Sequence, residues 1–170
     1  MMFLEVPYHH GAQHTLVRLY DDGVFLVTGR ERPNIMTIGW GSVAVIWKFP
    51  IFTVLVRPTR HSFSLIEEWG EFTVNVPHEN SLKKELLFCG TKSGRDVDKF
   101  RETGLTASPG RRVSVPFIAD CEWIYECRVL FRQPMNPAML DSKVTEKYYG
   151  SGDYHTVYFG EIVGSYLKDI

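Results

Sequence analysis

The order of apolar and polar residues predicts a chain built mainly from β-strands. Alternation with a period of two, as in residues 71–76, places successive side chains on opposite faces of a strand. Continuous β-branched runs, as in residues 51–56, are typical of strands in a buried sheet. The segments with one of these patterns are residues 16–20, 24–28, 34–41, 43–47, 51–56, 71–76, 120–131 and 156–166.

Turn-forming residues separate the predicted strands. Asp21-Asp22-Gly23 predicts a hairpin between the first two, and Lys48-Phe49-Pro50 predicts a tight turn between residues 43–47 and 51–56. Within 71–76, Phe72, Val74 and Val76 are expected to face inward and Thr73 and Asn75 outward. In 120–131, Cys121, Trp123, Tyr125 and Cys127 share one face and Glu122, Ile124, Glu126 and Arg128 the other, which predicts a half-exposed strand.

A few peripheral helices are expected between the strands. Apolar residues recur at helical spacing in residues 63–69 and 80–88, and Asn80 or Ser81 is the expected cap of the second. A third helix is expected to end at Gly104, and a fourth to begin at Asn136-Pro137.

The size and net charge of the chain limit which classes of binding partner are expected. A chain of 170 residues with 44% hydrophobic residues is expected to form one globular domain. Its net charge is −1, from 19 Lys and Arg against 20 Asp and Glu, and no basic run occurs, so neither nucleic acid nor an anionic membrane is an expected partner. The first ten residues do not resemble a signal peptide, and three cysteines leave one unpaired, so we expect reduced thiols and a cytoplasmic location.

An anion site is predicted directly after the 51–56 run. Residues 57–62 read R-P-T-R-H-S and lead into a helix, whose first amides lack intrahelical partners. Arginine forks and hydroxyl donors match phosphate oxygens. The alternative is that Arg57 and Arg60 are surface charges and Ser62 caps the helix.

The segment 89–100 is a candidate second wall of the same site, because two glycines, two hydroxyls and a cation precede another helix. A metal reading of His9, His10 and His14 is not favoured, because Gly11 interrupts any shared helical face and no further ligand has suitable spacing.

Five motifs, in order along nearly the whole chain, resemble the flavin reductase-like family of FMN-binding split barrels, close to flavoredoxin. They are N-x-M-T-x-G-W at 34–40, V-R-P-T-R at 56–60, E-F-T-V-N at 71–75, C-G-T-x-S-G-R-D-V-D-K-F at 89–100 and G-D-Y-H-T-V-Y-F-G-E-I at 152–162. The resemblance implies an antiparallel, Greek-key-like split β-barrel of about six strands, with helical insertions and usually a homodimer.

The resemblance also implies which residues bind FMN. The strand along the isoalloxazine matches Asn34, Met36, Thr37, Gly39 and Trp40; the phosphate and ribityl end matches Arg57, Thr59, Arg60, Ser62 and Phe63; the closing loop matches Cys89, Gly90, Ser93 and Lys99. Related reductases carry G-D-H-T near the nicotinamide. Here Tyr154 is inserted before His155, the candidate catalytic residue.

Simpler interpretations remain for several residues. Trp40 could belong to the barrel core, Cys89 could be a small buried hydrophobic residue, and His155 could be a structural histidine. A nucleophilic Cys89 has little support, because no residue within reach in the sequence pairs it with a histidine.

The expected function is an FMN-dependent oxidoreductase that takes a hydride from NADH or NADPH and passes electrons to free flavin, a metal or a partner protein. The alternatives are a flavoredoxin-type carrier without a nicotinamide site, and a barrel that binds another apolar ligand without redox chemistry. No residue distinguishes NADH from NADPH.

Overall fold

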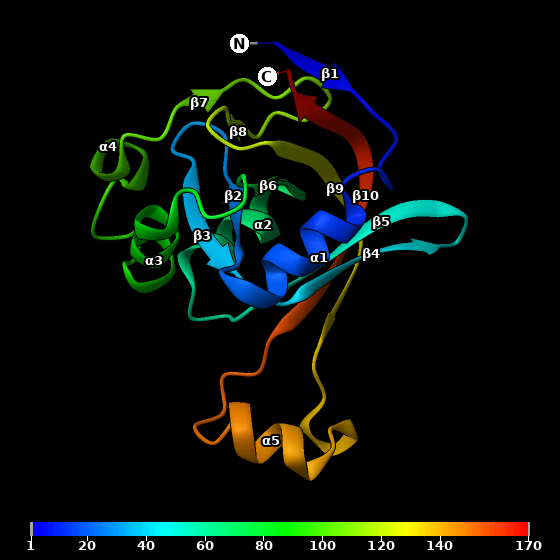
Figure 1. Cartoon of the computed structure of the whole chain (residues 1–170). Coiled ribbons are helices and arrows are strands. Elements are labelled where there is room, and N and C mark those ends of the chain that lie inside the picture. Colours follow the sequence, from blue (N-terminus) through cyan, green and yellow to red (C-terminus); the bar gives the residue numbers. More distant parts are fainter. Residues whose placement is uncertain (1, 170) are drawn as a thin grey trace.

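The computed structural model describes residues 2–169, which form an eight-stranded antiparallel sheet, a small two-stranded sheet and flanking helices (Figure 1). The strands of the sheet are β1 Phe3–Glu5, β2 Val24–Thr28, β3 Asn34–Ile38, β4 Gly41–Ile46, β5 Phe49–Val56, β6 Glu71–Val76, β9 Trp123–Pro134 and β10 Thr156–Lys168. Their order is β3-β2-β6-β9-β10-β5-β4, with β1 paired to β10, and these neighbours pair in the antiparallel sense. The predicted mainly β class is confirmed, and the sheet is not closed into a complete barrel.

The remaining elements cover this sheet. They are α1 Ala12–Asp21, α2 His61–Trp69, α3 Lys83–Thr91, α4 Lys99–Thr103, the short pair β7 Ala107–Ser108 and β8 Phe117–Ile118, a 3-10 turn η1 Pro137–Met139 and α5 Ser142–Tyr148. Residues 132–155 leave the body as an arm that carries η1 and α5, seen at the bottom of Figure 1. No helix among the described residues is long and apolar enough to cross a bilayer.

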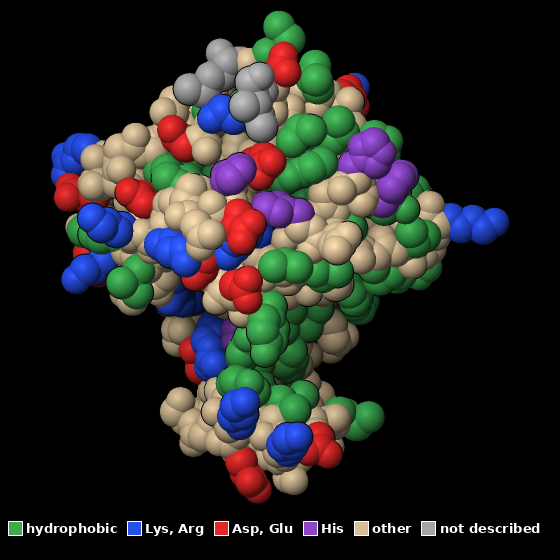
Figure 2. Space-filling view, in the orientation of Figure 1, with side chains coloured by type: hydrophobic (Ala, Val, Ile, Leu, Met, Phe, Trp, Pro, Cys, Tyr) green, Lys and Arg blue, Asp and Glu red, His purple; other side chains and the backbone are tan. Residues whose placement is uncertain are grey.

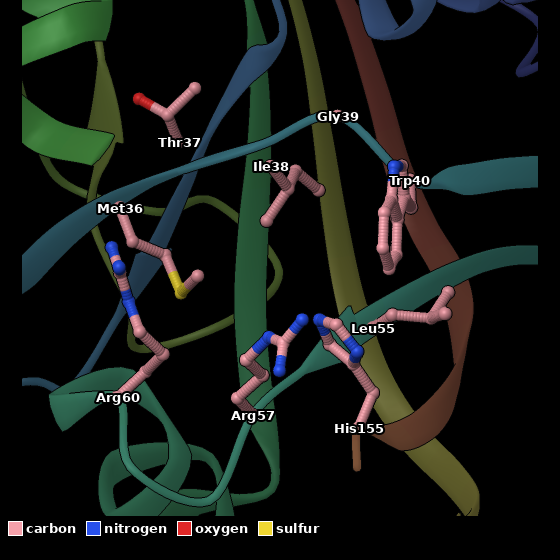
Figure 3. Close-up of a pocket in the computed structure, with 9 residues that line it drawn as sticks. All are labelled: Met36, Thr37, Ile38, Gly39, Trp40, Leu55, Arg57, Arg60 and His155. Atoms are coloured by element: carbon pink, nitrogen blue, oxygen red, sulfur yellow. The ribbon is translucent and has the colours of Figure 1, made fainter. Parts of the chain in front are cut away.

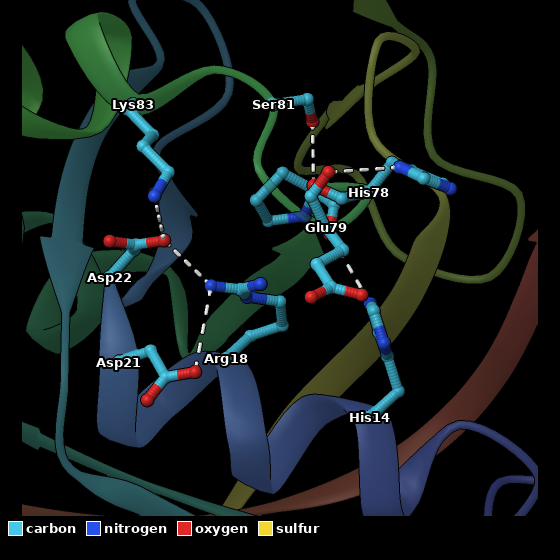
Figure 4. A network of polar contacts seen from close by, with 9 residues as sticks. His14, Arg18, Asp21, Asp22, His78, Glu79, Ser81 and Lys83 are labelled. Carbon is cyan, nitrogen blue, oxygen red and sulfur yellow. Dashed lines mark hydrogen bonds and ion pairs between the residues drawn. The ribbon is translucent and has the colours of Figure 1, made fainter.

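The predicted hairpin around Asp21-Asp22-Gly23 is wrong, because residues 12–21 form α1. Thr15, Arg18 and Leu19 are its buried residues, a helical spacing. The Arg18 guanidinium lies 2.6 Å from Asp22 Oδ2, and Lys83 Nζ reaches the same carboxylate at 3.3 Å (Figure 4). Gly23, at φ 87°, ends the helix in the left-handed conformation that glycine adopts without strain. Local ion pairing and a helix-ending glycine therefore replace the expected turn.

A separate set of contacts holds the other end of α1. His14 Nε2 lies 3.3 Å from Pro77 O and 3.6 Å from Glu122 Oε2. Among residues 2–169 no cluster of His, Cys, Asp and Glu is arranged to hold a metal ion.

Three smaller features also differ from the sequence prediction. The β4–β5 turn is made by Trp47 and Lys48, both at positive φ, so Phe49 and Pro50 belong to β5 rather than to the turn. Helix α3 starts at Lys83 after Leu82, without a side-chain cap, and extends through Cys89 and Gly90. The predicted fourth helix is divided into η1, capped by Asn136, and α5, capped by Asp141.

Both faces of the central strands are buried. One core cluster includes Phe72, Val74 and Val76 inside the barrel, and a second lies between the sheet and the segment after α3. Thr73 and Asn75 belong to this second face and are fully buried, which corrects the expectation that they point outward. Their side chains bond Pro116 O and Ile118 N, so the segment covering the sheet satisfies them.

The 120–131 segment is likewise more buried than its alternation predicts. Cys121 and Ile124 lie in the second core cluster, whereas Tyr125 and Cys127 lie in the first. Cys121 precedes β9 and therefore does not share the face predicted for it. The three cysteines are free and buried, which agrees with the expectation of unpaired thiols. Glu126 is fully buried as well.

Candidate functional site

Two adjacent cavities lie where β3, the end of β5 and the start of α2 meet. We call the first, of about 230 Å³, the strand cavity; its lining residues are Met36, Thr37, Ile38, Gly39, Trp40, Leu55, Arg57, Arg60 and His155 (Figure 3). We call the second, of about 190 Å³, the anion cavity; its lining residues are Asn34, Met36, Thr59, Arg60, His61, Ser62, Thr91, Lys92, Ser93, Gly94, Arg95 and Lys99. They share Met36 and Arg60, so one elongated molecule can occupy both.

Strand alternation decides how β3 contributes. The side chains of Met36 and Ile38 point into the strand cavity, while that of Thr37 points to the other side of the strand (Figure 3). The Thr37 hydroxyl donates to Leu86 O in α3 at 2.5 Å. Thr37 therefore offers its backbone to a ligand, and its side chain anchors α3.

Trp40 closes one end of the strand cavity and is not part of the barrel core. Its side chain is 37% exposed, and its ring makes an edge contact with Tyr148 at 4.9 Å between centroids. The ring centroid of His155 lies 5.0 Å away. An indole in this position can limit access to a flat ligand.

Arg57 and Thr59 fasten the arm to the body. Arg57 donates from Nη1 to Asp153 O at 2.9 Å and from Nη2 to Tyr148 O at 3.0 Å, and its guanidinium lies over the Tyr149 ring. Thr59 Oγ1 donates to Asp153 Oδ2 at 2.7 Å. Arg57 therefore lines the strand cavity rather than the anion cavity, and both terminal nitrogens of its guanidinium already donate to backbone oxygens of the arm.

His155 lies at the root of the arm with 9% of its surface exposed. Burial and the nearby Arg57 charge lower the pKa of His155 to about 4, so the imidazole is neutral at pH 7. Tyr149 Oη lies 2.7 Å from His155 Nδ1 and holds the ring in place. In this state His155 can hydrogen-bond to a ligand but carries no charge.

The anion cavity is built on the start of α2. Arg60 precedes the helix with extended backbone angles and no side-chain cap, so the first amides of α2 lack a capping side chain. Arg60 Nη2 donates to Gly90 O at 3.0 Å, and Asn34 Nδ2 donates to Ser62 Oγ at 2.8 Å. The opposite loop approaches closely, because a Cβ on Gly94 would collide with Asn34 Oδ1.

Positive charge is concentrated around this cavity without a matching carboxylate among its lining residues. Burial, together with neighbouring cations, lowers the pKa of Arg60 and of His61. The pKa of Lys99 falls to about 8, first through burial and then through Arg60. His61 Nδ1 is buried with no hydrogen-bond partner among the described residues. These cations destabilise one another's charged forms, and the His61 nitrogen has a free hydrogen-bonding position. A bound phosphate would neutralise the cations and could bond to that nitrogen, so the cavity suits a phosphate.

The closing segment, residues 89–100, contributes to the site mainly through its backbone. Lys99 Nζ donates to Ile35 O at 2.7 Å and to Cys89 O at 2.8 Å. Cys89 is fully buried, and burial raises the pKa of its thiol to about 11, which agrees with a small hydrophobic role. Ser93 lines the anion cavity, whereas Cys89 and Gly90 line neither cavity.

Most of the residues expected at the site meet there. The exception besides Cys89 and Gly90 is Phe63, which packs on the core beside Tyr158. Sequence reasoning missed Ile38, Leu55, His61, Thr91, Lys92, Gly94 and Arg95. Ile38, Thr91, Lys92, Gly94 and Arg95 lie inside the five motifs, and His61 lies in the predicted anion segment 57–62, so their position was a usable signal. Leu55 is brought in only by strand pairing.

Comparison with known proteins agrees with the fold. A relative from Archaeoglobus fulgidus, an uncharacterized protein, is 34% identical over 148 residues, which cover 85% of this chain and 73% of the relative. A flavoredoxin structure from Methanosarcina acetivorans is 26% identical with a TM-score of 0.67, covering 86% of this chain and 69% of that one. A putative flavin reductase with a split barrel domain from Shewanella frigidimarina is 18% identical with a TM-score of 0.69, covering 92% and 74%.

The family model described as "Flavin reductase like domain" matches residues 17–169. The match includes both cavities and each strand from β2 to β10. The chain therefore belongs to the flavin reductase-like domain family and has its split-barrel fold.

Proposed function

We propose that this chain binds FMN across the two cavities and acts as an oxidoreductase. The observation that carries the proposal is the pairing of a cavity along β3 with a cation-rich cavity that shares Met36 and Arg60. A flavin ring suits the first and a phosphate the second. The residues proposed to hold it are Asn34, Met36, Gly39, Trp40, Arg60, His61, Ser62, Ser93 and Arg95, with the Thr37 backbone.

Bound FMN would accept electrons from a nicotinamide or a redox partner and pass them to a flavin, metal or protein acceptor. The chain's residues bind and orient it. Trp40 and Tyr148 restrict water at one end of the strand cavity, and neutral His155 hydrogen-bonds a group placed there. Arg57 keeps these arm residues in position through Tyr148 O and Asp153 O.

An anaerobic absorption experiment tests the function. FMN-loaded protein is expected to show the flavin band, and NADH or NADPH is expected to bleach it. Bleaching by one nicotinamide alone would identify the donor. A protein that takes up no flavin would contradict the proposal.

A second candidate is a flavoredoxin-type carrier without its own nicotinamide site. The contacts of Trp40 with Tyr148 and His155 favour it, because these rings fill space at one end of the strand cavity that a second ligand ring would need. Flavin that binds but is bleached only by a reduced partner protein, and by neither nicotinamide, would select the carrier.

Trp40→Ala is expected to alter the flavin and leave the fold largely intact. The indole is partly exposed and makes edge contacts, so its loss should cost the apo-protein about 1 kcal/mol rather than the roughly 3–5 kcal/mol of a core truncation. Apo-protein melting and the flavin reduction potential are measured on the same variant. An unchanged potential with a collapsed melting temperature would place Trp40 in the core.

FMN binding is expected to weaken above pH 8. The Lys99 ammonium has a pKa of about 8, and a bound phosphate favours its charged form. If phosphate raises that pKa by about one unit, Kd rises about fivefold between pH 7 and 9. Lys99→Met should flatten this dependence. A Kd that falls with rising pH would have the wrong sign.

We also propose a homodimer. Trp47, at the β4–β5 turn, is 57% exposed. Its ring centroid lies 6.1 Å from those of Phe131 and Phe159, and the Phe131 and Phe159 rings stack with their centroids 5.5 Å apart. Hydrophobic side chains are also exposed along the neck between body and arm (Figure 2). Such contiguous apolar surface is typical of an interface.

Light scattering tests the dimer. Wild-type protein is expected at twice the chain mass, and Trp47→Glu is expected to lower it. A monomeric wild-type mass with FMN fully bound would contradict the dimer.

The three free cysteines agree with a proposed cytoplasmic location, where thiols stay reduced.

A further inference from the structure

Tyr149 is a buried phenol that the proposed function does not use. It caps the C-terminal end of α5, and 3% of its surface is exposed. Its ring stacks on that of Tyr154 with the centroids 4.8 Å apart, and the Arg57 guanidinium carbon lies over the ring, 5.1 Å from its centroid. Burial and these two contacts hold the phenol in one position.

The Tyr149 hydroxyl has one hydrogen and two neighbouring acceptors. Its oxygen lies 2.7 Å from His155 Nδ1 and 3.2 Å from Met135 Sδ. An imidazole lone pair is a strong acceptor, whereas a thioether sulfur is a weak one, and 2.7 Å is typical of a well-formed hydrogen bond from a hydroxyl. The hydroxyl therefore donates to His155 Nδ1.

This donation decides which ring nitrogen of His155 carries the proton. The imidazole is neutral at pH 7, so it has one N–H and one lone pair. Because Nδ1 accepts from Tyr149, the proton lies on Nε2. Within residues 2–169, Nδ1 is the ring nitrogen with a hydrogen-bond partner and Nε2 has none. His155 lines the strand cavity, so its Nε2–H is left for a ligand.

The other polar side chains around the strand cavity are also donors. Arg57 and Arg60 are its charged lining residues, and no carboxylate is among the residues that line it. Arg57 and His155 point toward the same part of the cavity (Figure 3). A second neutral lone pair would oppose an electron-rich ligand group there, whereas an Nε2–H donor stabilises one.

We propose that Tyr149 is a positioning residue that fixes His155 as the Nε2–H tautomer, so that the strand cavity offers a neutral donor to an electron-rich group of the bound flavin. The proposal rests on the proposed function, because the ligand group belongs to FMN. Tyr149 lines neither cavity, so it acts on the ligand through His155. The donor favours the reduced flavin ring over the oxidised ring, because the reduced ring is richer in electrons.

Nitrogen NMR of the apo-protein at pH 7 tests the tautomer without a ligand. The shifts of the two ring nitrogens give the ratio of the tautomers, and His155→Gln identifies the signals. In the wild type we expect the Nε2–H form to exceed the Nδ1–H form about tenfold. Tyr149→Phe keeps the ring but removes the donor, so the ratio should fall severalfold. Met135→Leu removes the sulfur and should leave the ratio unchanged.

Tyr154→Phe is the matched control, because it removes a hydroxyl from the ring that stacks on Tyr149 and leaves the bond to His155 in place. Its tautomer ratio should equal that of the wild type. If Tyr149→Phe does not fold, the wild type and Met135→Leu still decide. A hydroxyl that donates to sulfur would give mainly the Nδ1–H form in the wild type, and Met135→Leu would reverse it.

The reduction potential of FMN-loaded protein tests the consequence for the flavin. Tyr149→Phe and His155→Leu should both shift it to more negative values, and Tyr154→Phe should not. A purely structural Tyr149 would lower the melting temperature of Tyr149→Phe and leave both the tautomer ratio and the potential unchanged.

The proposal is overturned if the Nδ1–H form dominates in the wild type, if Tyr149→Phe has the tautomer ratio of Tyr154→Phe, or if the flavin potential does not move in Tyr149→Phe. If FMN does not bind, the proposed function fails and the donor role toward the flavin fails with it. The tautomer ratio of the apo-protein is measured independently of that outcome, so the two failures are distinguishable.

Discussion

Arg60→Ala is expected to weaken FMN binding roughly 10- to 100-fold while changing riboflavin binding little. Arg60 lines both cavities, and its guanidinium is the cation at their junction. A charge-assisted hydrogen bond contributes about 1.5–3 kcal/mol, which corresponds to that range of affinity. The measurement is calorimetric titration of the apo-variant with each flavin.

Arg101→Ala is the control, because the Arg101 side chain is 77% exposed and pairs with neighbouring Glu102. It should bind both flavins like the wild type. Equal loss of FMN and riboflavin affinity in Arg60→Ala would show that Arg60 supports the ring or the fold rather than a phosphate. Arg57→Ala should instead act through the arm, and so affect both flavins alike.

Glu126→Ala is expected to lower the free energy of unfolding by about 2–5 kcal/mol. The carboxylate is fully buried and accepts from the amides of Arg111 and Arg112, each at 2.6 Å, and from Tyr166 Oη at 3.3 Å. Removing it takes away the acceptor of two part-buried amide hydrogen bonds and of the buried Tyr166 hydroxyl, and each lost partner costs about 1–3 kcal/mol. For a domain of this size the melting temperature should fall by roughly 5–15 °C.

Thermal melting of the apo-protein measures this effect. Glu146→Ala removes an exposed carboxylate in α5 and should change stability by less than about 0.5 kcal/mol. Neither Arg111 nor Arg112 lines a described cavity, so folded Glu126→Ala protein should retain FMN affinity. A melting temperature equal to that of Glu146→Ala would show that the segment containing Arg111 and Arg112 is held by contacts other than those to Glu126.

Glu126 also shows where sequence patterns lose information about the fold. Alternation correctly predicted strands at β2, β3, β6 and β10, because each has a period-two or continuous apolar pattern. It could not reveal that the segment after α4 covers the outer face of the sheet and buries Glu126. A polar residue on the opposite face to the core is read as exposed unless long-range packing is known.

The error at α1 has a different cause. Asp21-Asp22-Gly23 has the composition of a hairpin turn, but the same residues suit a helix end, where Asp22 pairs with Arg18 and Gly23 takes positive φ. Only the tertiary burial of Thr15 and Leu19 decides between the two.

At the site, contiguous motifs predicted most of the lining, but not how the donors are shared. Arg57 and Thr59 belong to the same short segment as Arg60, yet their side chains bond the arm through Asp153. Asp153 lies more than ninety residues away in the chain, and no local pattern predicts such a contact. The separation of arm-fastening from anion-facing residues therefore required the structure.

The most direct test of the central claim is the affinity of wild-type apo-protein for FMN and for riboflavin, measured by calorimetry at pH 7. The two ligands differ only in the phosphate that the anion cavity is proposed to bind. We expect FMN to bind at least about tenfold more tightly, with the difference carried by Arg60 and the start of α2. Equal affinity for the two flavins would contradict the account.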